Sequence, residues 1–462
     1  MSRSIRSPLR RLLAAIRPLT ALALAAPEPA DAGGLPYSLN SWMGDLSGQI
    51  GNRTVGTLFL PGTHDSGTSP LGSLSDPAPD LWANTDTHGI SLMVNDVSKP
   101  GAAAGTNPTI TEIYNDLTKV LTDNGGLRTA IVDIVNTVAS GFSHAQPNNI
   151  QWQLDNGIRY LDLRVCDNAG DKTMYLCHGF LGERLDTVLA AIAAFVAKND
   201  KEILVLDFNH LYAGDSLNGT AMTDTSALVK AITDAFGSEL LTPADRDKPL
   251  NEIWAGKGQI FVLFPGGSAV NPAFLNNDAE GNSCSDADKP NDIWSPWPGA
   301  DTYQGVIDGG NTNIATWTAW PSGCTGKPTF FVLQAQVTPD TADIAVASAC
   351  GLLNEFQILP DWLIQAIATD IATYLQAPNP SNVTASACNL DQQDIGSLGT
   401  IAQQSNHYIV NQFVLTPEWQ CRPNVMIVDW YTQPIDNQDY GMSDYGNYGP
   451  LVSARNPGVC PQ

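Results

Sequence analysis

Adjacent His64 and Asp65 follow a short apolar run, residues 58–60, and the turn residues Pro61 and Gly62. This pattern is typical of a buried strand that enters a turn. Arg164 and His178 stand near the ends of two later strand-like runs. One imidazole can remove a proton from an attacking hydroxyl, a second can protonate a leaving oxygen, and a fixed cation can stabilise phosphate oxygens. The residue types therefore favour cleavage of a phosphodiester.

Further polar residues stand in the same strand-like runs. Asp162 precedes Arg164 by two positions and shares its strand face, either as a buried ion-pair partner or as a substrate-binding residue. Asp207 and Asn209 lie within residues 202–210, where they are candidates for substrate binding or for structural hydrogen bonding. His210, in the same run, is open to the same two interpretations.

Two carboxylates are candidates for holding the imidazoles in their working tautomers. A catalytic imidazole normally needs such a partner. Asp65 directly follows His64, and Asp429 ends the last strand-like run. The remaining histidines are interpreted as ordinary loop or surface residues: His88, His144 and His407.

Strand-like segments alternate with helical ones along the chain. The clearest unit is a strand at 174–180, a helix at 185–196 and a strand at 202–210. Further strands are predicted at 259–264, 329–337 and 425–430, and further helices at 226–236 and within 342–374. The candidate residues come from the ends of several strands, so the pattern favours an α/β fold of the TIM-barrel type over an open sheet.

The domain organisation predicted from the sequence is one barrel between two terminal segments. Residues 1–32 are typical of an export leader, with an Arg-rich start, an apolar stretch and a small-residue cleavage site. The barrel is expected over 36–435, with insertions at 70–150 and 266–325, the second forming rim or lid loops. Residues 436–462 are predicted to be an irregular tail.

The chain is strongly acidic, with a formal net charge of −24 at pH 7 over 462 residues. This charge makes nucleic acid an unsuitable partner. It also disfavours tight docking on anionic lipid, unless a local basic or apolar rim offsets the repulsion. Tryptophans of the second half could form such a rim or could simply pack loops: Trp294, Trp297, Trp317 and Trp320. After the leader, no apolar run approaches the roughly 20 residues that span a bilayer.

The chain has 8 cysteines, and their spacing favours disulfides over zinc ligation. Cys166 and Cys177 flank a polar turn between two strand-like runs, while the others lie in the second half. An even number of cysteines is typical of an oxidising compartment. With the leader, this predicts a secreted or periplasmic protein.

Three motifs together resemble the X-domain of phosphatidylinositol-specific phospholipase C. They are residues 153–165 (Gln-Leu-Asp-Asn-Gly-Ile-Arg-Tyr-Leu-Asp-Leu-Arg-Val), 175–179 (Tyr-Leu-Cys-His-Gly) and 206–210 (Leu-Asp-Phe-Asn-His). The closest resemblance is to the X-domain-containing phospholipase C-like proteins, which have only that domain, and it is strong over residues 53–215. It implies a distorted (β/α) barrel of the phospholipase C-like phosphodiesterase type.

The resemblance also implies roles for the candidate residues. His64 resembles the general base that deprotonates the inositol 2-hydroxyl, and His178 the general acid that protonates the departing diacylglycerol oxygen. Asp65 would orient His178, and Asp429 would orient His64. The first product would be a cyclic inositol phosphate, which water could open slowly. The implied partner is an inositol phospholipid met transiently at a membrane surface.

Arg164 separates two branches of the family. Calcium-dependent members have an acidic residue at this place and Asn after the first histidine, whereas this chain has Arg164 and Asp65. The chain therefore resembles the metal-independent bacterial type, in which a guanidinium takes the electrostatic role of calcium. We expect no cofactor and no metal, although Asp162 and Asp207 could still contribute to a cation site.

Two other functions remain compatible with the sequence. A metal-dependent phosphodiesterase acting on another lipid diester could use the same barrel, but no cluster of Glu and Asp adjoins His64. A catalytically idle X-domain that binds inositol, a glycan or a protein is the second alternative. Intact His64 and His178 argue against it.

Overall fold

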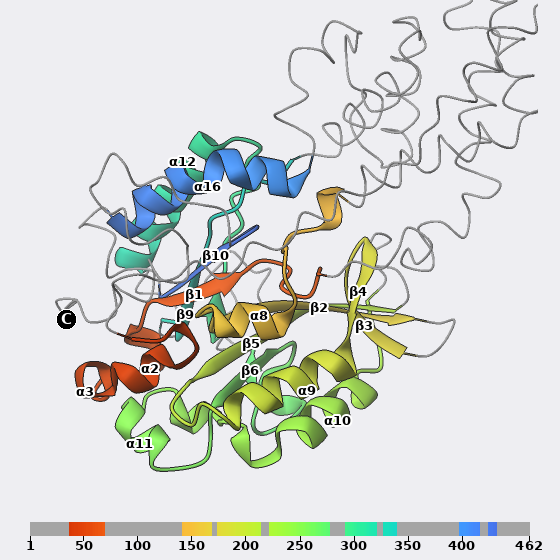
Figure 1. Cartoon of the computed structure of the whole chain (residues 1–462), viewed down its shortest axis with the longest axis vertical. Helices are drawn as coiled ribbons and strands as arrows, with labels where there is room; N and C mark the ends of the chain where they lie inside the picture. Colours follow the sequence, from red (N-terminus) through yellow and green to blue (C-terminus); the bar gives the residue numbers. More distant parts are fainter. Residues whose placement is uncertain are drawn as a thin grey trace, which may run out of the picture.

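The computed structural model describes residues 37–69, 141–168, 173–213, 221–277, 292–320, 327–339, 397–415 and 424–431 (Figure 1). The predicted leader and tail lie outside the described residues, as do the predicted helices within 342–374 and most of the insertion at 70–150. In the part of the chain that the structure describes, no helix is long and apolar enough to cross a membrane.

The centre of the molecule is a nearly closed barrel of parallel strands. Its strand order is β7-β6-β5-β2-β1-β10-β9-β8, and each neighbouring pair is parallel. The strands are β1 Leu60–Thr63, β2 Tyr160–Asn168, β5 Leu204–Ala213, β6 Ile260–Phe264, β7 Leu275–Asn276, β8 Ile293–Trp294, β9 Phe330–Gln334 and β10 Val425–Val428. Asp292 N donates to Asn276 O at 3.1 Å and so connects the two end strands. The predicted α/β barrel is confirmed.

Two cores follow from the alternation of side chains along the strands. Inward-facing residues such as Tyr160, Val205 and Phe261 fill the barrel, together with Trp42 and Ile50 from two short helices. These helices are α2 Trp42–Asp45 and α3 Ser47–Ile50. They close the end of the barrel at which the strands begin, whereas the opposite end carries the candidate residues.

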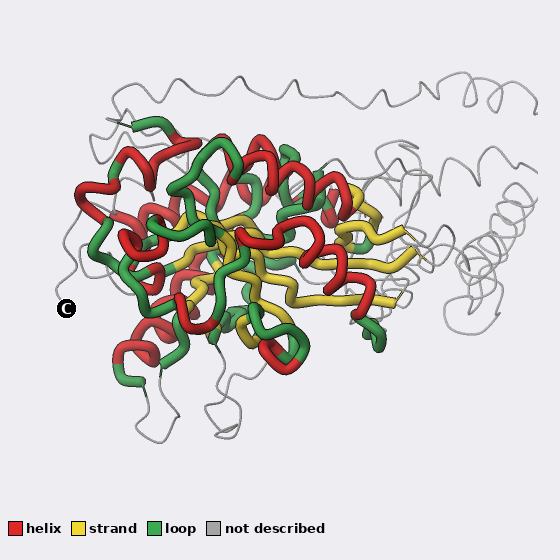
Figure 2. The backbone as a smooth tube through the Cα atoms, turned by 90° about the horizontal axis from the view of Figure 1, so that it is seen from below, coloured by secondary structure: helices red, strands yellow, loops and turns green. Residues whose placement is uncertain are grey.

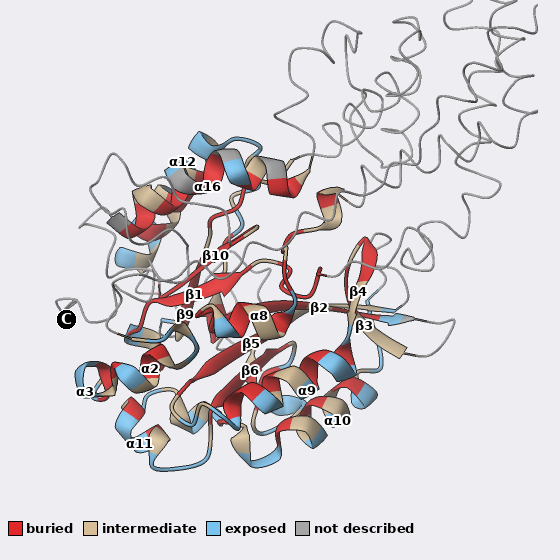
Figure 3. Ribbon diagram, in the orientation of Figure 1, coloured by how far each residue is buried: buried red, intermediate tan, exposed pale blue. Residues whose placement is uncertain are grey.

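The second core lies between the outer faces of the strands and a layer of helices (Figures 1 and 2). The longer helices are α8 Ile150–Asp155, α9 Leu185–Val196, α10 Ser226–Phe236, α11 Leu250–Trp254, α12 Tyr303–Thr318 and α16 Leu398–Leu415. The 3-10 helices are η1 Leu39–Ser41, η2 Val55–Thr57, η3 Gly237–Glu239, η4 Pro243–Asp245 and η5 Gly267–Ala269. The barrel strands are mostly buried between these layers, and β5 becomes partly exposed in its second half (Figure 3).

The predicted strand at 174–180 is present, but it does not belong to a parallel βα unit. It forms β3 Thr173–His178, which pairs antiparallel with β2, and β4 Phe180–Arg184 pairs antiparallel with β3. β2 therefore extends beyond the barrel, and the hairpin returns the chain to the barrel mouth. Cys166 and Cys177 form a disulfide across this hairpin. The other cysteines lie outside the described residues.

Residues 266–325 differ from the predicted rim loops. They supply β7, β8 and the helix α12 to the barrel. The two strands have 2 residues each, too short for a recognisable alternation. Gly310 of α12 allows close packing on α16, because a Cβ at this position would lie 2.4 Å from the Phe413 ring.

Three of the four tryptophans of this region follow the interpretation that they pack loops. They form an aromatic cluster with Phe331: Trp294, Trp317 and Trp320. These pack the loops and the end of α12 onto the barrel. Trp297 differs, because 58% of its surface is exposed.

Candidate active site

The lumen of the barrel changes from apolar to polar toward the carboxyl ends of the strands. On β2 the inward series is Tyr160, Asp162 and Arg164, and on β5 Val205 is followed by Asp207. The parallel register pairs Asp162 with Asp207. Such a polar layer at the carboxyl ends of barrel strands is the usual place for an active site.

His64 lies at the junction of β1 and β10. The parallel ladder pairs Thr63 with Val428, so the residues that follow, His64 and Asp429, are neighbours. His64 Nδ1 is 2.8 Å from Asp429 Oδ1, and His64 Nε2 is 2.8 Å from Arg164 Nη2. In the neutral imidazole, the N–H at Nδ1 donates to Asp429, and the lone pair at Nε2 accepts from the Arg164 guanidinium. Asp429 thus occupies the place predicted for a carboxylate that orients His64.

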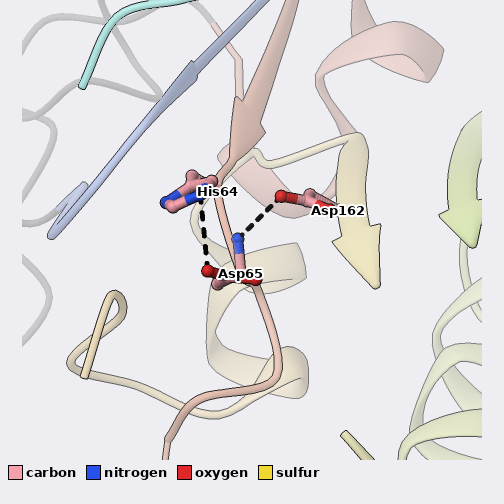
Figure 4. A group of neighbouring side chains, drawn as sticks. All are labelled: His64, Asp65 and Asp162. Atoms are coloured by element: carbon pink, nitrogen blue, oxygen red, sulfur yellow. Dashed lines mark hydrogen bonds and ion pairs between the residues drawn. The ribbon is translucent and has the colours of Figure 1, made fainter. Parts of the chain in front are cut away.

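Asp65 is the central carboxylate of the site. Its backbone is left-handed, with φ of 42°, and its amide N donates to Asp162 Oδ2 at 3.0 Å (Figure 4). Asp tolerates this conformation better than most residues. Asp65 Oδ1 is 2.5 Å from Arg164 Nε, and Oδ2 is 3.3 Å from His64 Nε2 and 3.3 Å from His178 Nδ1. One carboxylate therefore contacts the guanidinium and both imidazoles.

His178 enters the site from the β3 hairpin and completes the pair of imidazoles. Its ring lies 6.0 Å from the His64 ring, at an interplanar angle of 77°. Besides Asp65, its Nδ1 is 3.1 Å from Ser143 O. The His178 side chain is 29% exposed against 12% for His64, so it is the more open of the two. The structure thus brings together all the residues predicted to be catalytic.

Burial and the surrounding charges shift the pKa values of the two imidazoles in opposite directions. Burial alone would lower the pKa of His64, but the carboxylates of Asp65 and Asp429 outweigh it and raise that pKa to about 9. Burial lowers the pKa of His178, and the positive charges of Arg164 and His64 lower it further. Arg164 and the imidazoles hold the pKa of Asp65 below its ordinary value in spite of burial. His64 is therefore the more basic of the two imidazoles in the free site.

The predicted substrate-binding residues form the floor of the site. Asn209 Nδ2 donates to Asp162 Oδ1 at 2.6 Å and to Asp207 Oδ2 at 3.2 Å. Tyr160 Oη and Asn277 Nδ2 also donate to Asp207. Burial and the charge of Asp162 raise the pKa of Asp207 to about 7. The structure brings these residues together as one hydrogen-bonded network.

A β-bulge explains how Asn209 reaches this network. Leu163 pairs with Phe208, but Arg164 pairs with His210, so Asn209 is the extra residue of β5. A bulge re-aims the side chains around it. His210 Nδ1 consequently lies 2.6 Å from Asn209 Oδ1, and the charge of His210 acts on Asp65.

One group of described residues has the spacing of a cation site. Single ligand atoms of His64, Asp65 and Asp162 all lie within 4.8 Å of one another. Arg164 stands among them, with its guanidinium 2.5 Å from Asp65, 2.8 Å from His64 and 3.7 Å from Asp162. A positive charge is therefore already in place, and a divalent ion bound there would face it at close range.

The sequence did not predict a role for two buried glutamines near the site. Gln153 accepts from Thr63 Oγ1 at 2.7 Å and donates to Ser66 O at 2.7 Å, so it holds the turn around His64. Gln146 contacts the strand ends themselves. Gln153 is the first residue of the motif at 153–165, and its place in that motif is the feature that could have pointed to it in the sequence.

No protein-family model matches the chain, but several curated proteins are similar to it. The PI-PLC X domain-containing protein 2 of Mus musculus is 27% identical over 316 residues, which are 68% of this chain and 74% of that protein. Its Homo sapiens counterpart is 27% identical over 226 residues, 48% of this chain and 59% of that protein. The chain thus spans less than two thirds of the human protein. The predicted resemblance to the X-domain family is confirmed.

A third relative and a solved structure are each named a phospholipase C. The variant-surface-glycoprotein phospholipase C of Trypanosoma brucei brucei is 23% identical over 324 residues, 69% of this chain and 75% of that protein. The structure of a phosphatidylinositol-specific phospholipase C mutant from Staphylococcus aureus has a TM-score of 0.47 at 14% identity, covering 91% of this chain and 100% of that one.

Proposed function

We propose that the protein is a phosphoric diester hydrolase of the phospholipase C type, acting on phosphatidylinositol or a related inositol phospholipid. The single observation that supports this most strongly is the contact of Asp65 with Arg164, His64 and His178 at one barrel mouth. Two imidazoles and a guanidinium, held between carboxylates, can supply the base, the acid and the fixed positive charge for diester cleavage by internal transfer.

In the first step, His64 Nε2 takes the proton of the inositol 2-hydroxyl as its oxygen bonds to phosphorus. The bond from phosphorus to the glycerol oxygen breaks, and His178 protonates that oxygen to release diacylglycerol. Arg164 stabilises the non-bridging oxygens, which a planar guanidinium can contact two at a time. The product is a cyclic inositol phosphate, and the two imidazoles end with exchanged protonation states. In the reverse sense, they could activate water to open the ring.

Substrate binding changes the charges that set the pKa values of the two imidazoles. A bound phosphodiester adds negative charge beside His178, and an opposite charge at this distance raises the pKa of an imidazole. The pair therefore titrates with macroscopic pKa values that belong to both residues. A bell-shaped pH dependence of turnover is expected.

The floor residues have a supporting part in this proposal. Both polar atoms of the Asn209 carboxamide contact protein groups. Its Oδ1 lies beside His210, and its Nδ2 donates to Asp162 and Asp207. This arrangement supports the structural interpretation of the network. Direct contact of these residues with inositol hydroxyls stays a prediction, as does export of the protein.

Phosphorus NMR of phosphatidylinositol vesicles tests the proposal. The wild type should release a cyclic inositol phosphate before any acyclic product. His64→Ala and His178→Ala should each release none, while their melting temperatures show that they are folded. Vesicle binding without release by the wild type would reject the hydrolase and favour the idle binding module.

A further inference from the structure

The Gln146 side chain joins the ends of the two strands that lead to His64 and Asp429. It is fully buried, and its Nε2 donates to His64 O at 2.8 Å and to Val428 O at 2.8 Å. Its Oε1 lies 3.5 Å from Tyr431 N. One carboxamide therefore contacts the main chain of both strand ends.

Backbone hydrogen bonding between β1 and β10 ends just before Asp65 and Trp430. The ladder between β1 and β10 ends with the bond from His64 N to Val428 O, at 3.1 Å. The residues beyond it turn away in left-handed conformations, Asp65 with φ of 42° and Trp430 with φ of 45°. A buried carbonyl left without a donor is costly. The carboxamide supplies that donor to His64 O and ties it to Val428 O.

The same short segment, residues 143–146, reaches the second imidazole. Ser143 O lies 3.1 Å from His178 Nδ1. The segment is itself fixed, because the amides of Ala145 and Gln146 each donate to Thr68 Oγ1 at 3.1 Å and Ala145 O accepts from Trp430 N at 2.8 Å. The segment is thus tied to the turns that follow both strands and to His178.

We propose that Gln146 is a positioning residue that fixes His64 against Asp429 and, through the 143–146 segment, sets the place of His178. Among the described residues, its carboxamide hydrogen-bonds to main-chain atoms, so it acts through the residues it holds. The catalytic part of this inference rests on the proposed function, whereas the positioning of His64 can be measured without turnover.

The chain offers a matched control in Gln259. This glutamine is also buried, and its Nε2 donates to Asn199 O at 2.7 Å and to Glu202 O at 3.0 Å, at the opposite end of the barrel. Gln146→Leu and Gln259→Leu remove the same kind of bridge. We expect similar drops in melting temperature from both variants, because each leaves two carbonyls without that donor.

Only Gln146→Leu should disturb the site. We expect its kcat on phosphatidylinositol vesicles to fall about tenfold or more with little change in KM, since small misplacements of catalytic groups have large effects on rate. Proton NMR should show the His64 titration shifted from its wild-type midpoint in Gln146→Leu and unchanged in Gln259→Leu. The His64 signal is assigned by its loss in His64→Ala.

Equal effects of the two leucine variants on kcat and on the His64 titration would overturn the inference. A wild type without turnover would reject the proposed function, while the His64 titration would still decide the role of Gln146. If Gln146→Leu does not fold, Gln146→Glu replaces it. Its activity relative to the wild type should be higher at pH 5 than at pH 8, because only the protonated carboxyl can donate, and a pH-independent ratio would contradict the inference.

Discussion

Asp65 Oδ1 lies 2.5 Å from Arg164 Nε, and this ion pair is the centre of the site. Asp65 holds the guanidinium among the three groups that could otherwise converge on a cation, His64, Asp162 and Asp65 itself. It also lies 3.3 Å from each imidazole. The proposed metal-independent cleavage depends on this placement.

Replacement of Arg164 by Lys tests whether turnover depends on the planar geometry of the guanidinium as well as on its charge. Lys keeps the charge but cannot contact Asp65 and His64 at once while presenting a plane to phosphate. We expect kcat on phosphatidylinositol to fall by about 10²-fold, as for the loss of one fixed donor to a transition-state oxygen. Arg184→Lys, at an exposed arginine paired with Asp186, is the control and should be neutral. Equal rates for both variants would contradict the role given to Arg164.

Asp429→Asn should shift the pH dependence of turnover. The Asp429 carboxylate favours the charged imidazole, so its removal should lower the pKa of His64 from about 9. The limb of the rate profile assigned to the base should shift to lower pH, and the maximal rate should fall because the tautomer is no longer fixed. Rate profiles and NMR titration of both proteins measure this. An unshifted His64 titration would show that Asp429 does not set its charge.

The ion pair of His64 with Asp429 also has a consequence for stability. The folded pKa of His64 lies above the ordinary value of 6.5, so the contribution of the pair is complete below pH 6.5 and is lost as the pH rises through about 9. Urea unfolding of the wild type and of His64→Ala between pH 6 and 10 should therefore converge at high pH. A difference that stays constant would contradict this.

Asp207→Asn should remove a second pH dependence of the free energy of unfolding, in a lower pH range. The pKa of Asp207 rises from 3.8 to about 7 on folding, so the folded protein keeps a proton that the unfolded chain loses between these values. The free energy of unfolding should fall across this interval, by on the order of 4 kcal/mol for a shift of about three units. The Asn variant should lack this slope in urea unfolding at pH 4 to 8. An identical slope in both proteins would assign it to other groups.

Gly62 is required by the narrow lumen below His64. A Cβ at this position would lie 2.8 Å from Ile427 Cγ2 and 3.1 Å from Tyr160 Cβ. Gly62→Ala should therefore destabilise the protein by about 1–3 kcal/mol, as overpacking does, and lower the rate by displacing β1. Gly48→Ala is the control, since no atom lies within 4 Å of its Cβ. Matching melting temperatures for the two variants would show that β1 tolerates the methyl group.

The sequence predicted the parallel barrel and the residues at its mouth because these depend on local patterns. His64, Asp65 and Asp429 follow short apolar runs, and the period of two along β2 placed Asp162 and Arg164 on one face. Other features depend on contacts between distant segments. The antiparallel return of β3, the two-residue strands β7 and β8 and the bulge at Asn209 have no local pattern that distinguishes them. The Gln146 bridge likewise spans segments that are far apart in the chain.

The most direct measurement is the initial rate of inositol phosphate release from phosphatidylinositol vesicles, with EDTA and with added calcium, for the wild type and His64→Ala. Wild-type turnover should be the same in EDTA and in calcium, because Arg164 supplies the positive charge, and His64→Ala should show none. Wild-type turnover that EDTA abolishes and calcium restores would contradict the proposed metal-independent cleavage.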